Sequence, residues 1–213
     1  MARKRLKHLD PAKQEAILRA AAEEFTERGF GAASINRIIQ RSGMSKGSVY
    51  YYFEDKADLF ATTLERASQR MMEEVGWPSL EVLAADEFWD ALLELTRRSV
   101  DLARRDEWWV RLSRALHRFR HEAGAGPAVT RMQKFAREWW KTLIGRGQIL
   151  GVIRTDLPPD LLVEIAMGAD EAGDRWMLER WERLPEEDLL KLVDARVDLL
   201  RDMLDKENEG WEG

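Results

Sequence analysis

The chain has 213 residues, of which 45% are apolar, and it carries a formal net charge of −5. This length can bury one large core or two small ones, and the apolar content is that of a globular protein rather than a disordered chain. No apolar run approaches the ~20 residues of a membrane-spanning helix, and no apolar segment follows the basic N-terminus as it would in a signal peptide. The lack of cysteine excludes disulfides and thiolate chemistry. We therefore expect a cytoplasmic globular protein without membrane contact.

Charge is distributed unevenly along the chain. Residues 1–56 hold eleven Lys and Arg against seven Asp and Glu, a net charge of +4, which leaves −9 on residues 57–213. A basic head on an acidic body is typical of proteins that bind a polyanion such as nucleic acid. Charge also fluctuates along chains that bind no polyanion, so this asymmetry needs support from local motifs.

The first predicted element is a helix that begins at Pro11, with Asp10 as its cap. Apolar residues then recur at helical spacing until Gly29, where we expect the helix to end. No stretch of four or more residues anywhere in the chain alternates as a β-strand does. The pattern predicts an all-α protein.

Two short helices joined by a tight turn are predicted next, between Ser34 and Phe53. Ser34 caps the first, Gly43 supplies the left-handed conformation at which it ends, and Ser45 caps the second. The outward positions at the start of the second helix carry small, hydroxylated, basic and phenolic side chains. Such a helix-turn-helix favours entry of its second helix into the major groove of DNA.

All three tyrosines of the chain lie side by side at positions 50–52. Consecutive residues on a helix point about 100° apart, so the three rings cannot all enter one core. At least one phenol is expected to be exposed, where it can contact a phosphate or a base. The alternative is that the rings anchor a small three-helix core, which fits Tyr50 in part and Tyr51 poorly.

A longer fourth helix is predicted over residues 55–76, where it links an N-terminal head to the rest of the chain. Later helices are predicted at 86–105, 107–122, 127–147, 159–182 and 186–206. The fold expected is all-α with about nine helices: a helix-turn-helix domain at 1–54 and a larger helical domain at 55–213.

The run AAEEFTERGFGAASINRIIQRSGMSKGSVYYYFEDKADLFATTLERA, residues 21–67, resembles the N-terminal domain of the TetR family of repressors. About fifteen positions agree in type and spacing, within F..RGF, I...SGMSKGSVYYYF and DKADLF. The resemblance extends over residues 10–67 and fades beyond them. It implies a homodimer whose heads occupy successive major grooves of a pseudo-palindromic double-stranded DNA operator. It also implies a small-molecule effector pocket and a dimer interface in the C-terminal domain.

Carried over position by position, the resemblance assigns a set of DNA contacts. Lys46 and Tyr51 are expected at base edges, whereas Tyr50, Tyr52 and Lys56 are expected at the backbone, where contacts position the protein without reading sequence. The whole set is Ser34, Ser45, Lys46, Gly47, Ser48, Tyr50, Tyr51, Tyr52 and Lys56. The basic arm at residues 3–7 either reaches a minor groove, adds phosphate attraction, or does nothing specific.

The last two predicted helices are interpreted as the dimer interface. The final helix carries apolar residues at spacings of four, four, three and four, and its neighbour offers small residues that permit close approach. The alternative is that both faces are buried inside one protomer. The predicted interface residues are Leu162, Ile165, Ala169, Trp176, Leu189, Val193, Val197, Leu200 and Leu204.

Tryptophan is abundant, with nine residues in the chain and eight of them within residues 77–181. Two adjacent pairs, at 108–109 and 139–140, must each diverge by about 100° on a helix, so one ring can face the core while the other lines a cavity. The effector expected is hydrophobic or aromatic, with arginines nearby for an anionic group. The alternative is that these rings are ordinary core. The predicted pocket residues are Trp108, Trp109, Arg111, His117, Trp139 and Trp140.

Enzymatic chemistry and metal binding find little support. His117 and His121 have the spacing of a metal pair, yet no third ligand is marked and arginines crowd the position. The sequence has no phosphate-cradling glycine loop and no nucleophile motif. We therefore expect no enzyme, no cofactor and no metal. A ligand-responsive DNA-binding repressor is preferred over a constitutive DNA-binding protein of the same fold, which would need no cavity.

Overall fold

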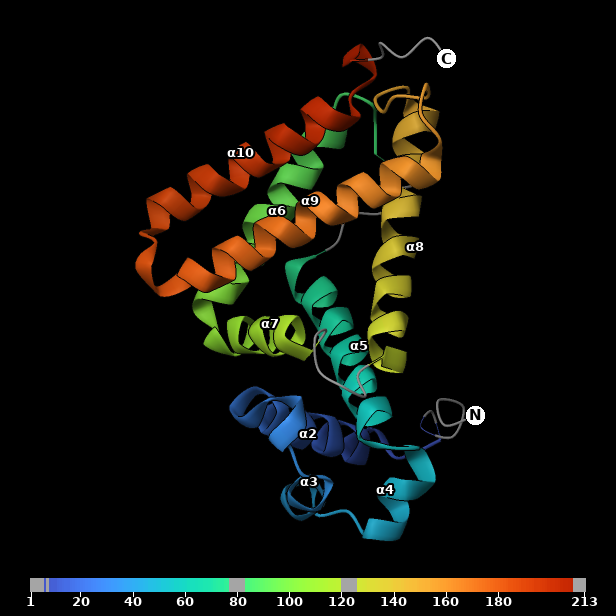
Figure 1. Ribbon diagram of the computed structural model, residues 1–213, viewed down its shortest axis with the longest axis vertical. Helices are drawn as coiled ribbons and strands as arrows, with labels where there is room; N and C mark the ends of the chain where they lie inside the picture. Colours follow the sequence, from blue (N-terminus) through green and yellow to red (C-terminus); the bar gives the residue numbers. More distant parts are fainter. Residues whose placement is uncertain (1–5, 7, 77–82, 120–125, 209–213) are drawn as a thin grey trace. The chain divides into compact units, whose positions relative to one another are not determined.

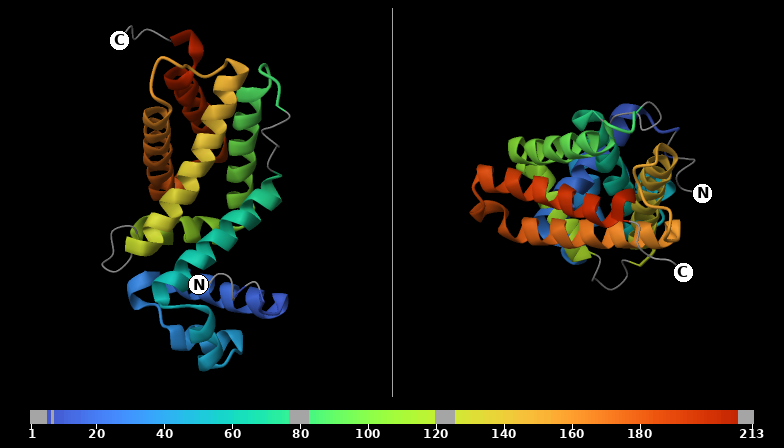
Figure 2. Two further views of the ribbon diagram at one scale, coloured as in Figure 1. Left: turned by 90° about the vertical axis from the view of Figure 1, so that its right-hand side faces the viewer. Right: turned by 90° about the horizontal axis from the view of Figure 1, so that it is seen from above.

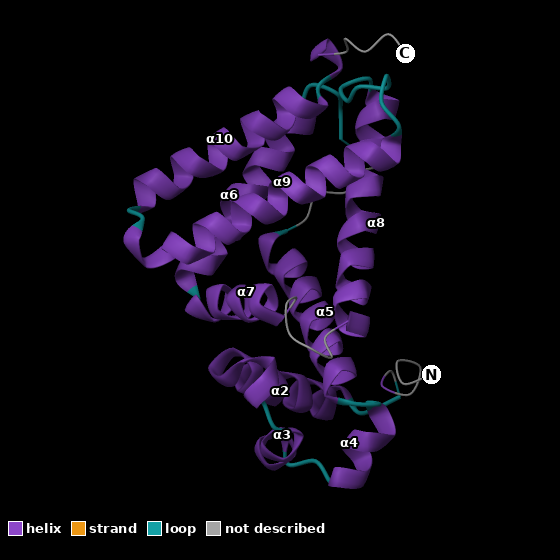
Figure 3. Ribbon diagram, in the orientation of Figure 1, coloured by secondary structure: helices purple, strands orange, loops and turns teal. Residues whose placement is uncertain are grey.

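The protein is described here by a computed structural model covering Leu6 and residues 8–76, 83–119 and 126–208. Nine α-helices, α2 to α10, and two short 3-10 helices cover most of these residues, none of which lies in a strand of a sheet (Figure 3). One isolated antiparallel bridge joins Ile153 to Asp205. The predicted all-α class is confirmed. No helix among the described residues combines the length and apolarity needed to span a membrane.

The chain divides into two compact units. Unit 1 comprises Met1–Met71 and Asp106–Gln133, and unit 2 comprises Met72–Arg105 and Lys134–Gly213. Two helices, α5 (Lys56–Val75) and α8 (Gly126–Leu150), begin in unit 1 and continue into unit 2 (Figure 1). The boundary predicted at residue 54 separates a DNA-binding domain from an effector-binding and dimerisation domain. This functional division stays a prediction.

Helix α2 (Pro11–Ala32) opens unit 1 and begins where the sequence predicts. The Asp10 carboxylate accepts the backbone N–H groups of Ala12 and Lys13 at 3.0 and 3.1 Å, and Pro11 occupies a position whose N–H would have no partner. The helix does not end at Gly29. Instead, this glycine adopts φ +71°, which bends the chain before a final helical turn through Ala32.

The predicted helix-turn-helix is present as α3 (Ile35–Ser42) and α4 (Lys46–Tyr52). Gly43 ends α3 with φ +69°, the left-handed conformation expected there. Ile38, Val49 and Phe53 are buried beneath the two helices. The apolar spacing of these short segments therefore fixes which face each helix turns inward.

Four phenylalanines form the centre of unit 1. They are Phe25 and Phe30 of α2, Phe60 of α5, and Phe119 of α7 (Glu107–Phe119), and all four are buried. Ring centroids lie 4.2 Å apart for Phe60 and Phe119 and 4.5 Å apart for Phe25 and Phe60, in edge-to-face geometry. Such contacts favour one arrangement of rings beyond the burial of their area. They fix α5 and α7 against α2.

Unit 2 contains α6 (Phe88–Arg105), α8 from Lys134 onward, α9 (Pro159–Arg180) and α10 (Glu186–Leu204), with the 3-10 helices Trp181–Arg183 and Lys206–Asn208 (Figure 2). Val100, Met177, Leu189 and Val193 form a buried cluster where α6, α9 and α10 meet. Beside it, Arg97 of α6 donates two hydrogen bonds of 2.8 and 2.7 Å to Asp194 of α10. Apolar packing and a forked ion pair thus join the same two helices.

The face of α10 predicted as a dimer seam is buried within the protomer. Leu189 and Val193 are completely buried in the cluster with α6, and the other seam residues of this helix also turn inward. Leu162 of α9 is buried in the same way. This fits the alternative of burial inside one protomer, which leaves these side chains little surface for a second copy, and the dimer interface itself stays a prediction. The residues concerned are Leu162, Leu189, Val193, Val197, Leu200 and Leu204.

Candidate nucleic-acid interface

The start of α4 is shaped by Ser45. Its hydroxyl oxygen accepts the backbone N–H of Ser48 at 3.2 Å and lies 2.8 Å from the Ser48 hydroxyl. This local capping stabilises a helix of only seven residues that would be marginal alone. Ser45, Lys46 and Gly47 are exposed, and Ser48 is half-buried.

The three tyrosines of α4 divide between surface and core as the helical spacing predicts. Val49 and Phe53 are buried, while Tyr50 and Tyr51 are 48% and 55% exposed. Tyr52 is half-buried and meets the edge of Tyr51 with ring centroids 5.0 Å apart. Tyr50 is thus more exposed than the three-helix-core alternative allowed. Two phenols and one ammonium therefore stand on the outer surface of a short, well-capped helix.

Lys56 has a structural partner that the sequence did not reveal. Its ammonium donates to the carbonyl oxygens of Gly31 and Ala33 at 3.0 and 3.3 Å and lies 4.6 Å from the centre of the Phe30 ring. These contacts fasten the start of α5 to the end of α2. An ammonium has three N–H donors, so the expected phosphate contact remains a prediction that uses the third.

A buried carboxylate lies behind α3. Glu24 of α2 is fully buried, and its Oε1 accepts the backbone N–H of Ser34 at 3.0 Å and Nε of Arg37 at 2.7 Å. Arg41 adds a second positive charge 3.9 Å from Oε2. Burial alone would raise the pKa of Glu24, but the hydrogen bonds from Arg37 and Ser34 and the nearby guanidinium charges outweigh it and lower the pKa below its usual value.

This network orients the N-terminus of α3. Ser34 gives no side-chain cap to that helix, and its backbone N–H is bound by Glu24 instead. The sequence contained one signal of this role, because Glu24 falls on the apolar face of α2 beside Phe25. A carboxylate at such a position is stable only when paired, which points to a basic partner elsewhere in the fold.

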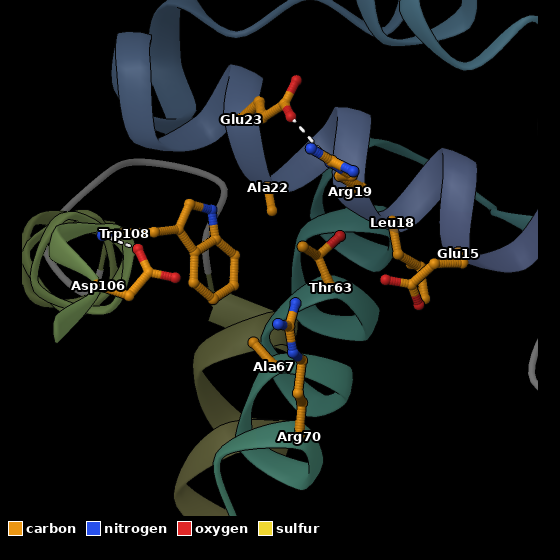
Figure 4. A pocket seen from close by; sticks show the side chains of 10 residues that line it. All are labelled: Glu15, Leu18, Arg19, Ala22, Glu23, Thr63, Ala67, Arg70, Asp106 and Trp108. Atoms are coloured by element: carbon orange, nitrogen blue, oxygen red, sulfur yellow. Dashed lines mark hydrogen bonds and ion pairs between the residues drawn. The ribbon is translucent and has the colours of Figure 1, made fainter. Parts of the chain in front are cut away.

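A groove of about 370 Å³ opens within unit 1 among α2, α5 and the beginning of α7 (Figure 4). The Trp108 indole lies on one side, with the side chains of Arg19 and Arg70 across from it. Charged groups dominate its walls, unlike the apolar wall expected of an effector pocket. The lining residues are Glu15, Leu18, Arg19, Ala22, Glu23, Thr63, Ala67, Arg70, Asp106 and Trp108.

The predicted effector residues fall in both units. Trp108 and Trp109 belong to unit 1 together with the exposed Arg111 and the half-buried His117, whereas Trp139 and Trp140 belong to unit 2. In each pair one ring is buried and the other partly exposed, as the helical spacing predicts. The described structure does not show all six around a single cavity, so the effector pocket stays a prediction.

Two further predictions concern residues outside the described part of the chain. The basic arm at residues 3–5 and 7 is one, and His121, the second member of the histidine pair, is the other. Among the described residues, no group of three or more His, Asp or Glu is arranged to hold a metal ion.

Comparison with known proteins identifies the N-terminal segment. Residues 17–63 match the model of the bacterial regulatory proteins of the tetR family. The HTH-type transcriptional repressor BepR of Brucella suis is 41% identical over 54 residues, which cover 25% of this chain and 26% of BepR. This first similarity is therefore confined to about a quarter of either protein.

Longer similarities are more distant in sequence. The HTH-type transcriptional repressor AcnR of Corynebacterium diphtheriae is 28% identical over 160 residues, covering 70% of this chain and 73% of AcnR. The crystal structure of the transcriptional regulator FadR from Bacillus subtilis superimposes with a TM-score of 0.64 over 87% of this chain and 96% of that one, at 18% identity. At that identity the superposition shows a shared fold.

Proposed function

We propose that the chain is a DNA-binding transcriptional repressor of the TetR family rather than an enzyme, and that a small hydrophobic or aromatic effector releases it from its operator. The observation that carries the proposal is the arrangement of side chains on α4. Ser45 caps the helix, Val49 is buried on its inward face, and its outward face presents Lys46, Tyr50 and Tyr51. Acting on chromosomal DNA would place the protein in the cytoplasm.

We assign α4 to the major groove. Lys46 and Tyr51 read base edges, because both are exposed at the beginning and on the outer side of the helix. The remaining polar groups hold the phosphate backbone, with Ser34 at the start of α3 and Lys56 at the start of α5. Phosphate contacts set the register, and the two base-reading side chains set the preferred sequence.

A homodimer is needed to read two half-sites, and we place its interface on the outer surface of α9 and α10. Leu161 and Trp176 of α9 are each 43% exposed, and Leu199 of α10 is 57% exposed. Ile165 and Ala169, also expected at the interface, are half-buried on α9. The interface proposed from the structure therefore keeps Ile165, Ala169 and Trp176 from the sequence prediction and adds Leu161 and Leu199.

Introducing one charged side chain into the proposed interface tests the dimer. Leu199→Arg should weaken self-association at least tenfold, since it introduces an unpaired guanidinium into a desolvated contact. Ile149→Arg is the matched control, because Ile149 is 79% exposed on α8, outside the proposed interface. Light scattering after size exclusion gives the measurement. A wild-type monomer at micromolar concentration would refute the dimer.

The effector is proposed from the tryptophan-rich helices. Aromatic rings with a few polar groups are typical of ligand sites, and Arg111 and His117 lie on the same helix as Trp108 and Trp109. The FadR structure of Bacillus subtilis is a complex with stearoyl-CoA, which provides a precedent for a large hydrophobic ligand on this fold. The competing proposal, a constitutive regulator without an effector, predicts that no ligand changes DNA affinity.

Release is proposed as a shift between populations. In one conformation of the dimer the two heads match successive major grooves, and in the other their separation does not fit. An effector that binds the second conformation more tightly would lower the fraction of dimer able to bind DNA. Helix α5 is the part of the chain that connects α4 to unit 2, because it follows α4 and continues into that unit. We propose that it transmits the effect of the effector to α4.

Selection of bound DNA from random duplexes tests the proposed function. We expect enrichment of an inverted repeat whose half-sites lie about one helical turn apart. Recovery of no consensus would refute sequence-specific regulation by α4. The enriched duplex then allows a ligand panel to be screened by tryptophan fluorescence, and ligands that bind should release the DNA.

A further inference from the structure

The corner between α4 and α5 is held by Asp58, which uses its two carboxylate oxygens in different directions. Oδ2 accepts the backbone N–H of Glu54 at 3.1 Å, just beyond the last turn of α4. Asp58 also donates its own backbone N–H to Oδ1 of Asp55 at 2.7 Å, so the corner is closed reciprocally. The other oxygen, Oδ1, faces away from the corner and accepts a hydrogen bond from Arg131.

Arg131 comes from α8, more than seventy residues further along the chain. Its Nη1 lies 2.5 Å from Asp58 Oδ1, its Nη2 lies 3.3 Å from the Thr62 hydroxyl, and its Nε and Nη2 lie 3.4 and 3.3 Å from the Glu65 carboxylate. The three charged side chains are largely shielded, with exposed fractions of 28% for Arg131, 14% for Asp58 and 17% for Glu65. One guanidinium therefore spans two turns of α5 from a neighbouring helix.

These contacts join α8 to α5 at the point where α5 follows the α4–α5 corner. Asp58 is a carboxylate that both closes the α4–α5 corner and binds α8, whereas Glu65 binds Arg131 two turns further along α5. Both α5 and α8 continue into unit 2, so a displacement of either helix there has a continuous helical connection to this contact. A shift of α8 against α5 must either carry Asp58 with it or break the Arg131–Asp58 bond.

We propose that Arg131 is a positioning residue for DNA recognition, which sets the orientation of α4 by holding Asp58. The inference rests on the proposed function only in that α4 is the helix that contacts DNA. Arg131 itself touches no DNA in this account. Its loss loosens the corner that follows α4, and the base-reading side chains Lys46 and Tyr51 then lose their fixed position against the bases.

The test compares the affinity for the selected duplex with that for a random-sequence duplex, by fluorescence anisotropy at one salt concentration. The ratio of the two cancels the sequence-independent phosphate attraction, which any change of charge would alter. Arg131→Met should lower the ratio about tenfold, and Arg131→Lys, which keeps the charge but not the forked geometry, should restore part of it.

Two carboxylate variants separate positioning from stability. Asp58→Asn keeps its one oxygen for the Glu54 N–H and then turns the amide NH2, a donor, toward the Arg131 donors, so it should lower the ratio as Arg131→Met does. Combined with Arg131→Met it should add little, because both remove the same contact. Glu65→Gln is the matched control. It weakens the other arm of the same guanidinium and should leave the ratio within about twofold.

Hydrogen exchange in the folded variants provides the structural readout. Arg131→Met and Asp58→Asn should lose protection at the amides of the α4–α5 corner, while the amides in the middle of α2 stay protected. A ratio within twofold of wild type in Arg131→Lys, Arg131→Met and Asp58→Asn would overturn the proposal, as would an equal loss in Glu65→Gln. A wild-type protein that prefers no duplex would instead refute the proposed function.

Discussion

Replacing Glu24 by Gln tests the reasoning about the buried network behind α3. Glutamine keeps the size of the side chain and an oxygen for the Ser34 N–H, but it removes the negative charge that faces Arg37 and Arg41. A hydrogen bond to a charged group contributes about 1.5–3 kcal/mol. Because the Arg37 side chain is 41% exposed and therefore screened by water, we discount that range to about 1–2 kcal/mol of unfolding free energy.

The effect must depend on pH with a defined sign. The pKa of Glu24 is lower in the folded protein than its usual value, so its charge stabilises the fold at neutral pH. That contribution is complete above the usual glutamate range and is lost as the pH falls through the lowered pKa. The difference between wild type and Glu24→Gln should therefore be largest near neutrality and should shrink in acid.

Urea unfolding followed by circular dichroism at neutral and acidic pH provides the measurement. Glu23→Gln is the matched control, because Glu23 lies one residue away on α2 and forms an exposed pair with Arg19 at 3.3 Å. It should change stability by no more than about 0.5 kcal/mol at either pH. Equal stability of wild type and Glu24→Gln at neutral pH, or a difference that does not change in acid, would refute the account of this network.

Three further predictions concern the DNA contacts of α4, Lys56 at the start of α5, and two glycines. Lys46→Ala and Tyr51→Ala should each cost about 1–3 kcal/mol of binding and relax the preferred sequence, as a repeated selection would show, whereas an unchanged consensus would remove them from the base-reading set. Lys56→Ala should weaken binding to all duplexes alike and lower the melting temperature, because it also loses the carbonyls of Gly31 and Ala33; an altered base preference would contradict this. Gly43→Ala should destabilise by about 1 kcal/mol because of its positive φ, although open space surrounds it. Gly145→Ala, with similar space but helical geometry, should stabilise by about 0.5–1 kcal/mol in the same melting assay, and equal effects of the two would refute the conformational argument.

Local chemistry was predictable from the sequence because its causes are local. Asp10 caps α2, Ser45 caps α4 and Gly43 adopts the left-handed conformation, and each acts within four residues of its own position. The adjacency of the three tyrosines likewise required exposure, since the helix geometry alone separates their directions. These features determine where α4 lies and which face it presents.

The missed contacts join residues that are distant in sequence. Glu24 meets Arg37 across a turn, and Arg131 meets Asp58 from more than seventy residues away. Periodicity marks Glu24 as lying on an apolar face but does not identify its partner. For Asp58 and Arg131 it gives no signal, because charged residues on a helix surface look alike whether they face water or a neighbouring helix. Lys56 shows the same limitation, since nothing in the sequence distinguishes a lysine that binds carbonyls from one that binds phosphate.

The α10 seam illustrates a different limit. Spacings of three and four residues correctly identified a buried face, but the period does not say which surface covers it. Here α6 of the same chain covers part of it, through Val100 against Leu189 and Val193. The exposed Leu199 breaks the expected pattern and was therefore not recognised as a candidate contact.

Chemical protection of the selected duplex tests the central claim most directly, namely that α4 reads DNA from the major groove. Methylation of guanine N7 reports the major groove, so wild-type protein should protect two patches about one helical turn apart, and Tyr51→Ala should lose protection within both. Lys56→Ala should leave the pattern of protected bases unchanged. Protection that is absent from the major groove, or that Tyr51→Ala and Lys46→Ala leave intact, would contradict the account.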